Sequence, residues 1–303
     1  MMEALLQKTM QGDFKSISRC ISLVENEVGD YEILLKSLPY NENKPIIGIT
    51  GPPGAGKSTI VDSLIGSMVN SGKQVAVLCV DPSSPFNMGA LLGDRIRMSD
   101  WYSHPSVFIR SLASRGSLGG LNHKIIEITD LLRTAPFDFI IVETVGVGQS
   151  EVEIAGLADV TVVVLVPESG DEVQAMKAGL MEIADIFVVN KSDRPDADLF
   201  VKNLRTMMEP AYGKMHHEIP VLKTIASQKS GIGELFQAIL ASVEKAHQHH
   251  RKLWLLTEKA YQLIQYRKMK SINRESLRND IEALRKESHF NLYSFVEGFS
   301  GGD

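Results

Sequence analysis

The chain has 303 residues, of which 44% are hydrophobic and 23% are charged, a balance typical of globular proteins and not of disordered or fibrous ones. The formal net charge of −5 comes without a long basic run, so we expect neither a nucleic-acid partner nor a membrane partner. No apolar stretch approaches the roughly 20 residues that span a bilayer, and the first residues lack the features of a signal or transit peptide. We therefore expect a cytoplasmic protein. The two cysteines, Cys20 and Cys79, give no support for a disulfide framework or a cysteine-based zinc site.

Three regions follow one another along the chain. Residues 1–44 are predicted to form an N-terminal helical extension, because apolar residues recur at helical spacing up to Pro39. Residues 45–245 are predicted to form an α/β domain with a mostly parallel central sheet covered by helices. Short β-branched runs alternate there with helical segments, at 46–50, 75–80, 107–110, 139–142, 160–166, 186–189 and 219–225. After Gly231 the chain turns helical, and residues 246–303 are predicted to form a C-terminal helical arm.

A phosphate-binding loop follows the first strand run. Residues 51–58 read Gly-Pro-Pro-Gly-Ala-Gly-Lys-Ser and match G-x-x-x-x-G-K-[ST], with a helical segment from Thr59 directly after them. Glycines let backbone N–H groups turn toward phosphate at a helix N-terminus, Lys57 is expected to reach the β- and γ-phosphates, and Ser58 is expected to ligate Mg²⁺. A turn that merely connects strand to helix would not need a lysine followed by a hydroxyl. The predicted P-loop NTPase fold thus binds nucleotide through Gly51, Pro52, Pro53, Gly54, Ala55, Gly56, Lys57, Ser58 and Thr59.

A second motif, at 190–193, predicts which base is bound. Asn190, Lys191 and Asp193 form N-K-x-D directly after a buried strand run, where open sheets bind ligands. An ionised Asp193 can accept hydrogen bonds from N1 and the amino group of guanine, so GTP should be preferred over ATP. Ala226 and Ser227, at the end of the next strand run, are expected to flank the base. A solvated Asn-Lys-Ser-Asp turn is the alternative.

An acidic residue closes the strand run at 139–142. Glu143 and Gly146 are spaced like the acid and the glycine of the D-x-x-G element of GTPases, with Glu in place of Asp. The position after Gly146, where Ras-like GTPases carry a water-orienting glutamine, is Val147. This predicts slow hydrolysis by the protein alone.

Three segments together resemble one family. ETVGVGQSE at 143–151, preceded by VDPSS at 80–84 and LGDR at 92–95, is similar to the accessory GTPases of adenosylcobalamin-dependent methylmalonyl-CoA mutase, once catalogued as lysine/arginine/ornithine transport-system kinases. The resemblance covers about residues 45–240. It implies a metallochaperone-type GTPase, usually a homodimer, that gates cobalamin delivery and protects or reactivates the mutase.

The resemblance also implies roles for further residues. Asp94 resembles a Mg²⁺-proximal carboxylate of the first switch, Asp81 lies near the metal, and Glu143 orients water or Mg²⁺. Asp171, Gln174 and Lys177 lie in a segment, 168–177, that resembles a further switch responding to the partner. The predicted catalytic set is Lys57, Asp94, Glu143 and Lys177, and the predicted metal set is Ser58, Asp81, Asp94 and Glu143.

Plainer interpretations stand beside these. Residues 171–177 can be a solvated helix face, and Asp94 with Arg95 a surface charge pair. His247, His249 and His250 invite a nickel site, although an exposed helix with neutral imidazoles is the commoner case. Two rival functions also remain open: a nucleoside-triphosphate-dependent kinase linked to amino-acid transport, and a nucleotide-sensing scaffold whose helical arm binds partners.

Overall fold

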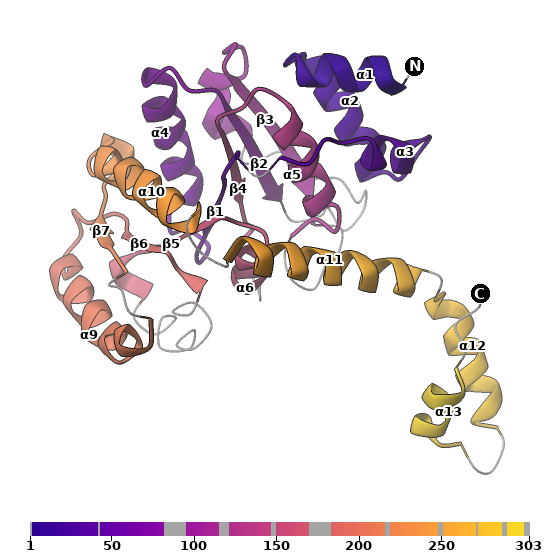
Figure 1. Ribbon diagram of the computed structural model, residues 1–303. Coiled ribbons are helices and arrows are strands. Elements are labelled where there is room, and N and C mark those ends of the chain that lie inside the picture. Colours follow the sequence, from indigo (N-terminus) through magenta and orange to yellow (C-terminus); the bar gives the residue numbers. More distant parts are fainter. Residues whose placement is uncertain are drawn as a thin grey trace. The chain divides into compact units, whose positions relative to one another are not determined.

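The computed structural model describes residues 2–41, 43–81, 95–114, 121–146, 150–169, 183–215, 219–247, 251–270, 272–286 and 290–299 (Figure 1). They belong to two compact units, Met1–Lys252 and Leu253–Asp303. The first unit contains the sheet and the N-terminal helices, and the second contains most of the C-terminal helices.

The first unit is built on a seven-stranded sheet in the order β3-β2-β4-β1-β5-β6-β7. All six pairings between neighbouring strands are parallel, which confirms the predicted α/β fold. The five inner strands are buried along their whole length, so their sequences read as nearly continuous apolar runs, whereas the edge strands β3 and β7 include partly exposed residues. The strands are β1 Ile46–Thr50, β2 Val75–Asp81, β3 Val107–Ala113, β4 Phe139–Glu143, β5 Val160–Leu165, β6 Ile186–Val189 and β7 Val221–Lys223.

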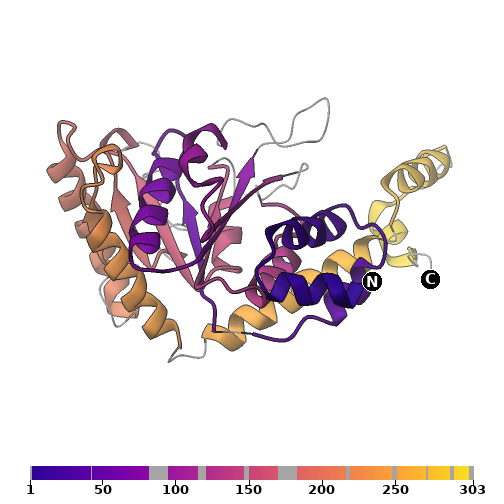
Figure 2. The same ribbon diagram turned by 90° about the horizontal axis from the view of Figure 1, so that it is seen from above.

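Helices cover both faces of this sheet (Figures 1 and 2). Successive strand residues point to opposite faces. Val162 and Val164 accordingly pack in the core with α4 (Lys57–Asn70) and α10 (Ile232–His247), whereas Val163 and Leu165 pack with α9 (Ala197–Met215). The short helix α6 (Ser150–Ala155) lies so close to β1 that a Cβ added at Gly48 would be 2.4 Å from Ile154.

The predicted N-terminal extension consists of three helices, α1 (Met2–Met10), α2 (Phe14–Glu25) and α3 (Tyr31–Lys36). It packs on the side of the sheet that carries β3 and α5 (Ile125–Thr134). The rings of Phe14 and Phe108 meet edge to face with centroids 5.5 Å apart. Partly buried ion pairs join the same surfaces, with Arg110 3.2 Å from Glu25 and Lys124 2.7 Å from Glu27.

The second unit is helical. It contains α12 (Arg274–Leu284) and α13 (Leu292–Gly298), and α11 (Arg251–Lys270) begins two residues before it. Among the described residues, no helix is both long and apolar enough to cross a membrane. We keep the division into an extension at 1–44, a nucleotide-binding domain at 45–245 and an arm at 246–303 as a proposal.

Two strand predictions differed from the structure by more than one residue at an end. The run 219–225 forms only β7, because Ile219 is buried among the side chains beneath α9 and Ile225 makes an isolated antiparallel bridge with Ser230. The run 107–110 continues to Ala113, since β3 pairs with β2 along its whole length and its polar residues Arg110 and Ser111 belong to the strand.

Candidate functional site

The candidate nucleotide site lies at the carboxyl ends of β1, β4 and β6, where parallel sheets bind ligands. A cavity of about 490 Å³ opens there. Three sequence-predicted segments meet in its wall: the phosphate loop, the end of β4 and the N-K-x-D loop. The residues that line it are Pro53, Gly54, Gly56, Lys57, Ser58, Thr59, Glu143, Thr144, Val145 and Lys191.

The phosphate loop wraps around its own lysine. Helix α4 begins at Lys57, two residues earlier than the sequence suggested, so Lys57 and Ser58 belong to its first turn. Nζ of Lys57 donates hydrogen bonds to the carbonyl oxygens of Gly51 and Pro52, at 3.0 and 3.1 Å. The helix N-terminus and this buried ammonium together provide the positive charge that a phosphate group requires.

Ser58 and Glu143 are held together at the base of the cavity. Oγ of Ser58 donates a hydrogen bond of 2.6 Å to Oε1 of Glu143, and both residues are buried. Glu143 ends β4, between β1 and β2 in the sheet, and Asp81 ends the adjacent β2 and is also buried. Beside them, the hydroxyls of Thr50 and Thr144 lie 3.0 Å apart.

These oxygen atoms suit a hard divalent cation. Mg²⁺ prefers hydroxyl, carboxylate, phosphate and water oxygens, and it usually keeps several waters. Within the residues that the structure describes, no three His, Cys, Asp or Glu side chains cluster as a ready metal cage. The donor set therefore fits Mg²⁺ bound by one or two protein oxygens and the phosphates of a nucleotide. Ligation by Ser58, Asp81 and Glu143 stays a prediction.

Gly146 places backbone directly against the phosphate loop. Its φ is +83°, and an added Cβ would be 2.3 Å from Nζ of Lys57 and 2.6 Å from the carbonyl oxygen of Gly51. No side chain fits in that space, so the glycine of the D-x-x-G-like element is needed both for its conformation and for the close approach.

Asn190 connects the base motif to the phosphate loop. Its side-chain amide donates to the carbonyl oxygen of Ala55 at 2.9 Å, and its Oδ1 accepts from the backbone N–H of Ala226 and the hydroxyl of Thr224, both at 3.1 Å. Lys191 extends over the same loop and donates to the carbonyl oxygen of Gly54 at 2.7 Å. The loops that would hold the phosphates and the base are therefore joined by hydrogen bonds, of which those of Asn190 are buried and that of Lys191 is exposed.

The remaining base-site residues lie around this connection. Asp193 and Ser227 are exposed, and Ala226 is buried, with its carbonyl oxygen accepting from Ser63 of α4 at 3.0 Å. The carboxylate of Asp193 and the backbone groups of Ala226 and Ser227 can meet the edge of a base. This assignment stays a prediction.

Residues 17–283 match the family described as methylmalonyl Co-A mutase-associated GTPase MeaB. The chain belongs to this family. As a member of the MeaB family it binds guanine nucleotide and hydrolyses GTP, which confirms the nucleotide chemistry and the family resemblance that the motifs indicated.

Individual relatives agree with this assignment. A GTPase of Pyrococcus horikoshii is 46% identical over 241 residues, which cover 78% of this chain and 76% of that protein. The GTPase ArgK of Escherichia coli is 38% identical over 245 residues, covering 78% and 74% of the two chains. A Caenorhabditis elegans protein named methylmalonic aciduria type A homolog, mitochondrial, is 36% identical over 223 residues, covering 68% of this chain and 55% of that protein.

Solved structures share the architecture. A structure described as LAO/AO transport system kinase has a TM-score of 0.67 and 26% sequence identity, and the match covers 98% of this chain and 95% of that one. HypB from Helicobacter pylori in complex with nickel has a TM-score of 0.50 and 18% identity, covering 76% and 97% of the chains. The second likeness shows the fold alone.

Several residues that the sequence analysis singled out lie outside the described residues, namely Asp94, Val147, Asp171, Gln174 and Lys177 of the family resemblance and His249 and His250 of the alternative nickel interpretation. His247 is the last residue of α10. Their predicted roles are unchanged by the structure.

Sequence reasoning missed one contact in this region. Arg194, next to the base motif, forms an ion pair with Glu168 in the 3-10 turn after β5 (Pro167–Ser169), and this hydrogen bond holds the pKa of the Glu168 carboxyl below its ordinary value. The two residues are 26 positions apart, so no local motif could reveal the pair.

Proposed function

We propose that this MeaB-family GTPase uses a cycle of GTP–Mg²⁺ binding and hydrolysis to gate cobalamin loading, protection or reactivation of a methylmalonyl-CoA-type mutase. The observation that carries the proposal is the match of residues 17–283 to a family described by its association with that mutase. The name of the C. elegans relative, methylmalonic aciduria type A homolog, agrees with it.

The phosphate half of the site has a simple task. Phosphoryl transfer to water requires mainly an in-line water and positive charge around the γ-phosphate oxygens. Lys57 and the backbone N–H groups of the loop supply part of that charge. Bound Mg²⁺ would supply the rest, held by Ser58 with Asp81, Asp94 and Glu143 nearby.

Glu143 has a second role in this proposal. Its carboxylate holds the hydroxyl of Ser58 at 2.6 Å in the state described here. The same carboxylate can accept hydrogen bonds from water, which makes it the described residue best placed to orient water bound to the metal or to the phosphate.

The base half selects guanine. We assign Asp193 to the N1–H and amino group of guanine, and we assign Ala226 and Ser227 to flank the base. Asn190 then acts by holding the two halves in register, through its bonds to Ala55 and Ala226.

Communication with the mutase is assigned to the segment 168–177. Lys177, Asp171 and Gln174 are its proposed responding residues, and the ion pair between Glu168 and Arg194 joins the start of the segment to the base motif. We further propose that the protein acts as a homodimer in the cytoplasm. It would need the mutase to complete hydrolysis, since Val147 replaces a water-orienting glutamine.

Complex formation tests this function. The tagged full-length chain is mixed with a cobalamin-dependent methylmalonyl-CoA mutase and loaded with GDP or with a non-hydrolysable GTP analogue, and the complex is measured by size-exclusion chromatography with light scattering. We expect nucleotide-dependent association. No association with either nucleotide would remove the mutase as partner, and phosphate transfer from GTP to added arginine or ornithine would favour the kinase instead.

A further inference from the structure

Asp81, the buried acid that ends β2, extends beyond one of the two strands that flank it. β2 pairs with β4 only as far as Cys79, which lies opposite Glu143. On its other side β2 pairs with β3 as far as Asp81, which lies opposite Ala113. In the described sheet, the last residue of β2 is therefore held by β3 alone, and its position depends on where β3 ends.

β3 is an edge strand, with β2 as its neighbour in the described sheet. The end of an edge strand lacks the second pairing partner that holds an inner strand. At this end, the backbone N–H of Ser114 donates a hydrogen bond of 3.0 Å to the carbonyl oxygen of Asp81. A displacement of Ala113 and Ser114 would therefore be transmitted directly to the backbone of Asp81.

The side chain of Asn122 holds this end of β3 from the start of α5. Its Nδ2 donates to the carbonyl oxygen of Ala113 at 2.7 Å, and its Oδ1 accepts from the backbone N–H of Lys124 at 2.8 Å. The residue is only 1% exposed. One end of the amide faces an acceptor and the other faces a donor, so only one orientation of the group satisfies both. Asn122 thereby attaches the end of β3 to the residue before α5.

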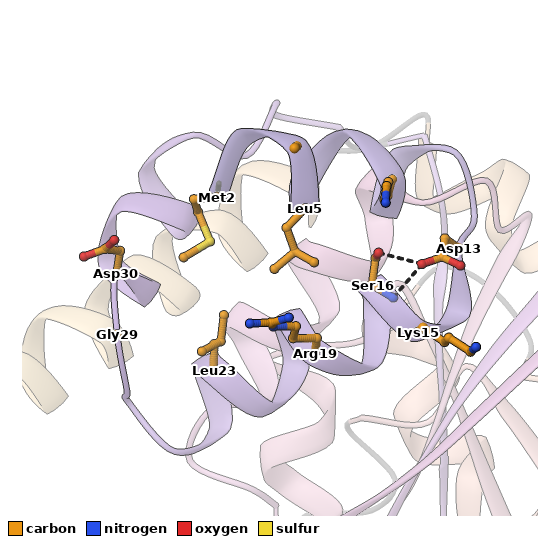
Figure 3. Close-up of a pocket in the computed structure, with 11 residues that line it drawn as sticks. Met2, Leu5, Asp13, Lys15, Ser16, Arg19, Leu23, Gly29 and Asp30 are labelled. Atoms are coloured by element: carbon orange, nitrogen blue, oxygen red, sulfur yellow. Dashed lines mark hydrogen bonds between the residues drawn. The ribbon is translucent and has the colours of Figure 1, made fainter.

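The start of α5 is itself held by the N-terminal extension. Nζ of Lys124 lies 2.7 Å from the Glu27 carboxylate and 3.0 Å from that of Glu127. Glu27 follows α2, which the carboxylate of Asp13 caps by accepting hydrogen bonds from the backbone N–H and the hydroxyl of Ser16, at 2.9 and 2.6 Å (Figure 3). The amide that holds β3 thus extends from a helix start that ion pairs keep in place.

We propose that Asn122 is a positioning residue for Asp81, because its bond to Ala113 holds the end of β3 and, through it, the carboxylate that would bind Mg²⁺. The inference rests on the proposed role of Asp81 in the metal site, and it does not depend on the mutase. Without the amide donor, the carbonyl oxygen of Ala113 would be buried without a partner, and the strand end would shift to find one. Groups behind a metal ligand contribute about 10–100-fold to metal affinity, and since Asn122 acts through the backbone we expect at least about fivefold.

Metal binding is measured with Mn²⁺, a paramagnetic substitute for Mg²⁺, on the full-length chain loaded with a non-hydrolysable GTP analogue and without mutase. Electron paramagnetic resonance gives the Kd for Mn²⁺, which Asn122→Ala should raise by at least about fivefold. The Kd for the analogue in EDTA should change by less than about twofold, because the bonds of Asn122 lie outside the phosphate loop and the N-K-x-D motif.

Asn41→Ala is the matched control. The Asn41 side chain also donates to a backbone carbonyl oxygen of α5, that of Arg133 at 3.3 Å, but near the other end of the helix. Its removal should change the Kd for Mn²⁺ by less than about twofold. Equal Mn²⁺ affinities of Asn122→Ala and Asn41→Ala would contradict the proposal.

A double-variant cycle separates the positioning role from the metal assignment. Asp81→Asn should itself raise the Kd for Mn²⁺, and adding Asn122→Ala to it should change that Kd by less than about twofold, since the group through which Asn122 acts is gone. Wild-type Mn²⁺ binding by Asp81→Asn would overturn the proposal by removing the metal role of Asp81. Full and additive effects of the two substitutions would overturn the positioning role alone.

Amide hydrogen exchange measures the strand end directly, without metal or nucleotide. The N–H of Ser114 should exchange at least about fivefold faster in Asn122→Ala than in the wild type, whereas that of Thr144, which donates to β1 at 3.0 Å, should not change. Asn122→Asp, which keeps the acceptor oxygen and removes the amide donor, is the second variant and carries the test if Asn122→Ala does not fold. Unchanged exchange at Ser114 would show that Asn122 does not hold the end of β3, and would overturn the proposal.

Discussion

Oγ of Ser58 donates a 2.6 Å hydrogen bond to Oε1 of Glu143, joining the phosphate-loop helix to the carboxyl end of β4. The two residues are 85 positions apart in the chain and are both buried. If Ser58 ligates Mg²⁺ when nucleotide binds, its oxygen can bind the metal through a lone pair while its O–H still donates to the carboxylate. Glu143 would then orient the metal ligand and could also accept a hydrogen bond from water. This pair is thus the expected point at which metal binding and water positioning meet.

Glu143→Gln should reduce GTP hydrolysis by about 10–100-fold and raise the Mg²⁺ concentration for half-maximal activity, because groups that orient metal ligands contribute on that scale. Rates measured across a Mg²⁺ titration test this. Glu127→Gln is the control, since Glu127 is also buried but bonds to Lys124 outside the site. If Glu143→Gln and Glu127→Gln show the same dependence of GTP hydrolysis on Mg²⁺, the proposed role of Glu143 is wrong.

Gly146→Ala should weaken GTP binding by at least about tenfold, because a methyl group 2.3 Å from Nζ of Lys57 must displace the ammonium or the loop. The Kd for a fluorescent GTP analogue measures the effect. Gly233→Ala in α10 is the matched control, because a Cβ there has no neighbour within 4 Å. A GTP affinity for Gly146→Ala equal to that of the control would show that the close approach of Gly146 to Lys57 and Gly51 is not needed for GTP binding.

Asp193→Asn should weaken GTP binding and improve binding of xanthosine triphosphate, since xanthine presents an acceptor where guanine presents its amino group. Sites that depend on such hydrogen bonds discriminate by up to about 10⁴–10⁵-fold. Competition binding of the two triphosphates to wild type and variant measures the exchange of preference. An unaltered preference for GTP would mean that another residue recognises the base.

Lys124→Met should destabilise the first unit by about 3–5 kcal/mol, because it removes the cation that Glu127, which is buried, shares with Glu27, which is partly buried. Burial opposes the charge of Lys124, but hydrogen bonds to Glu27 and the attraction of Glu127 outweigh it and raise the pKa of its ammonium. Chemical denaturation measures the loss. Lys73→Met, which removes a half-exposed ion pair with Asp138, should cost less than about 1 kcal/mol. If Lys124→Met and Lys73→Met lower the free energy of unfolding equally, the ion pairs of Lys124 do not stabilise the packing of the N-terminal helices.

Much of the fold could be predicted because its inner strands are buried on both faces. The runs 46–50 and 186–189 match β1 and β6 residue for residue, because in these two segments the apolar residues begin and end with the buried strand. At 219–225 the pattern failed. Ile219 packs in the core before the strand begins, and Ile225 makes an isolated bridge after it ends. Apolar character alone does not distinguish such residues from residues of the strand.

The site, like the fold, has features that the sequence predicted and features that it did not. The phosphate loop, Glu143 and the N-K-x-D motif are local patterns, and parallel strands bring their carboxyl ends together, so the cavity that they line followed from the sequence. The bonds of Asn190 to Ala55, Thr224 and Ala226 did not follow. They join residues that are far apart in the chain, and only the packed structure fixes their distances.

The central claim is that hydrolysis is completed by a mutase partner. Single-turnover GTP hydrolysis is measured with and without a cobalamin-dependent methylmalonyl-CoA mutase, using Lys57→Ala to define the background. We expect the mutase to accelerate the wild type, by up to the roughly 10³–10⁵-fold that a partner can contribute when it completes the charge-stabilising shell. An unchanged rate at mutase concentrations that saturate the complex would contradict the account.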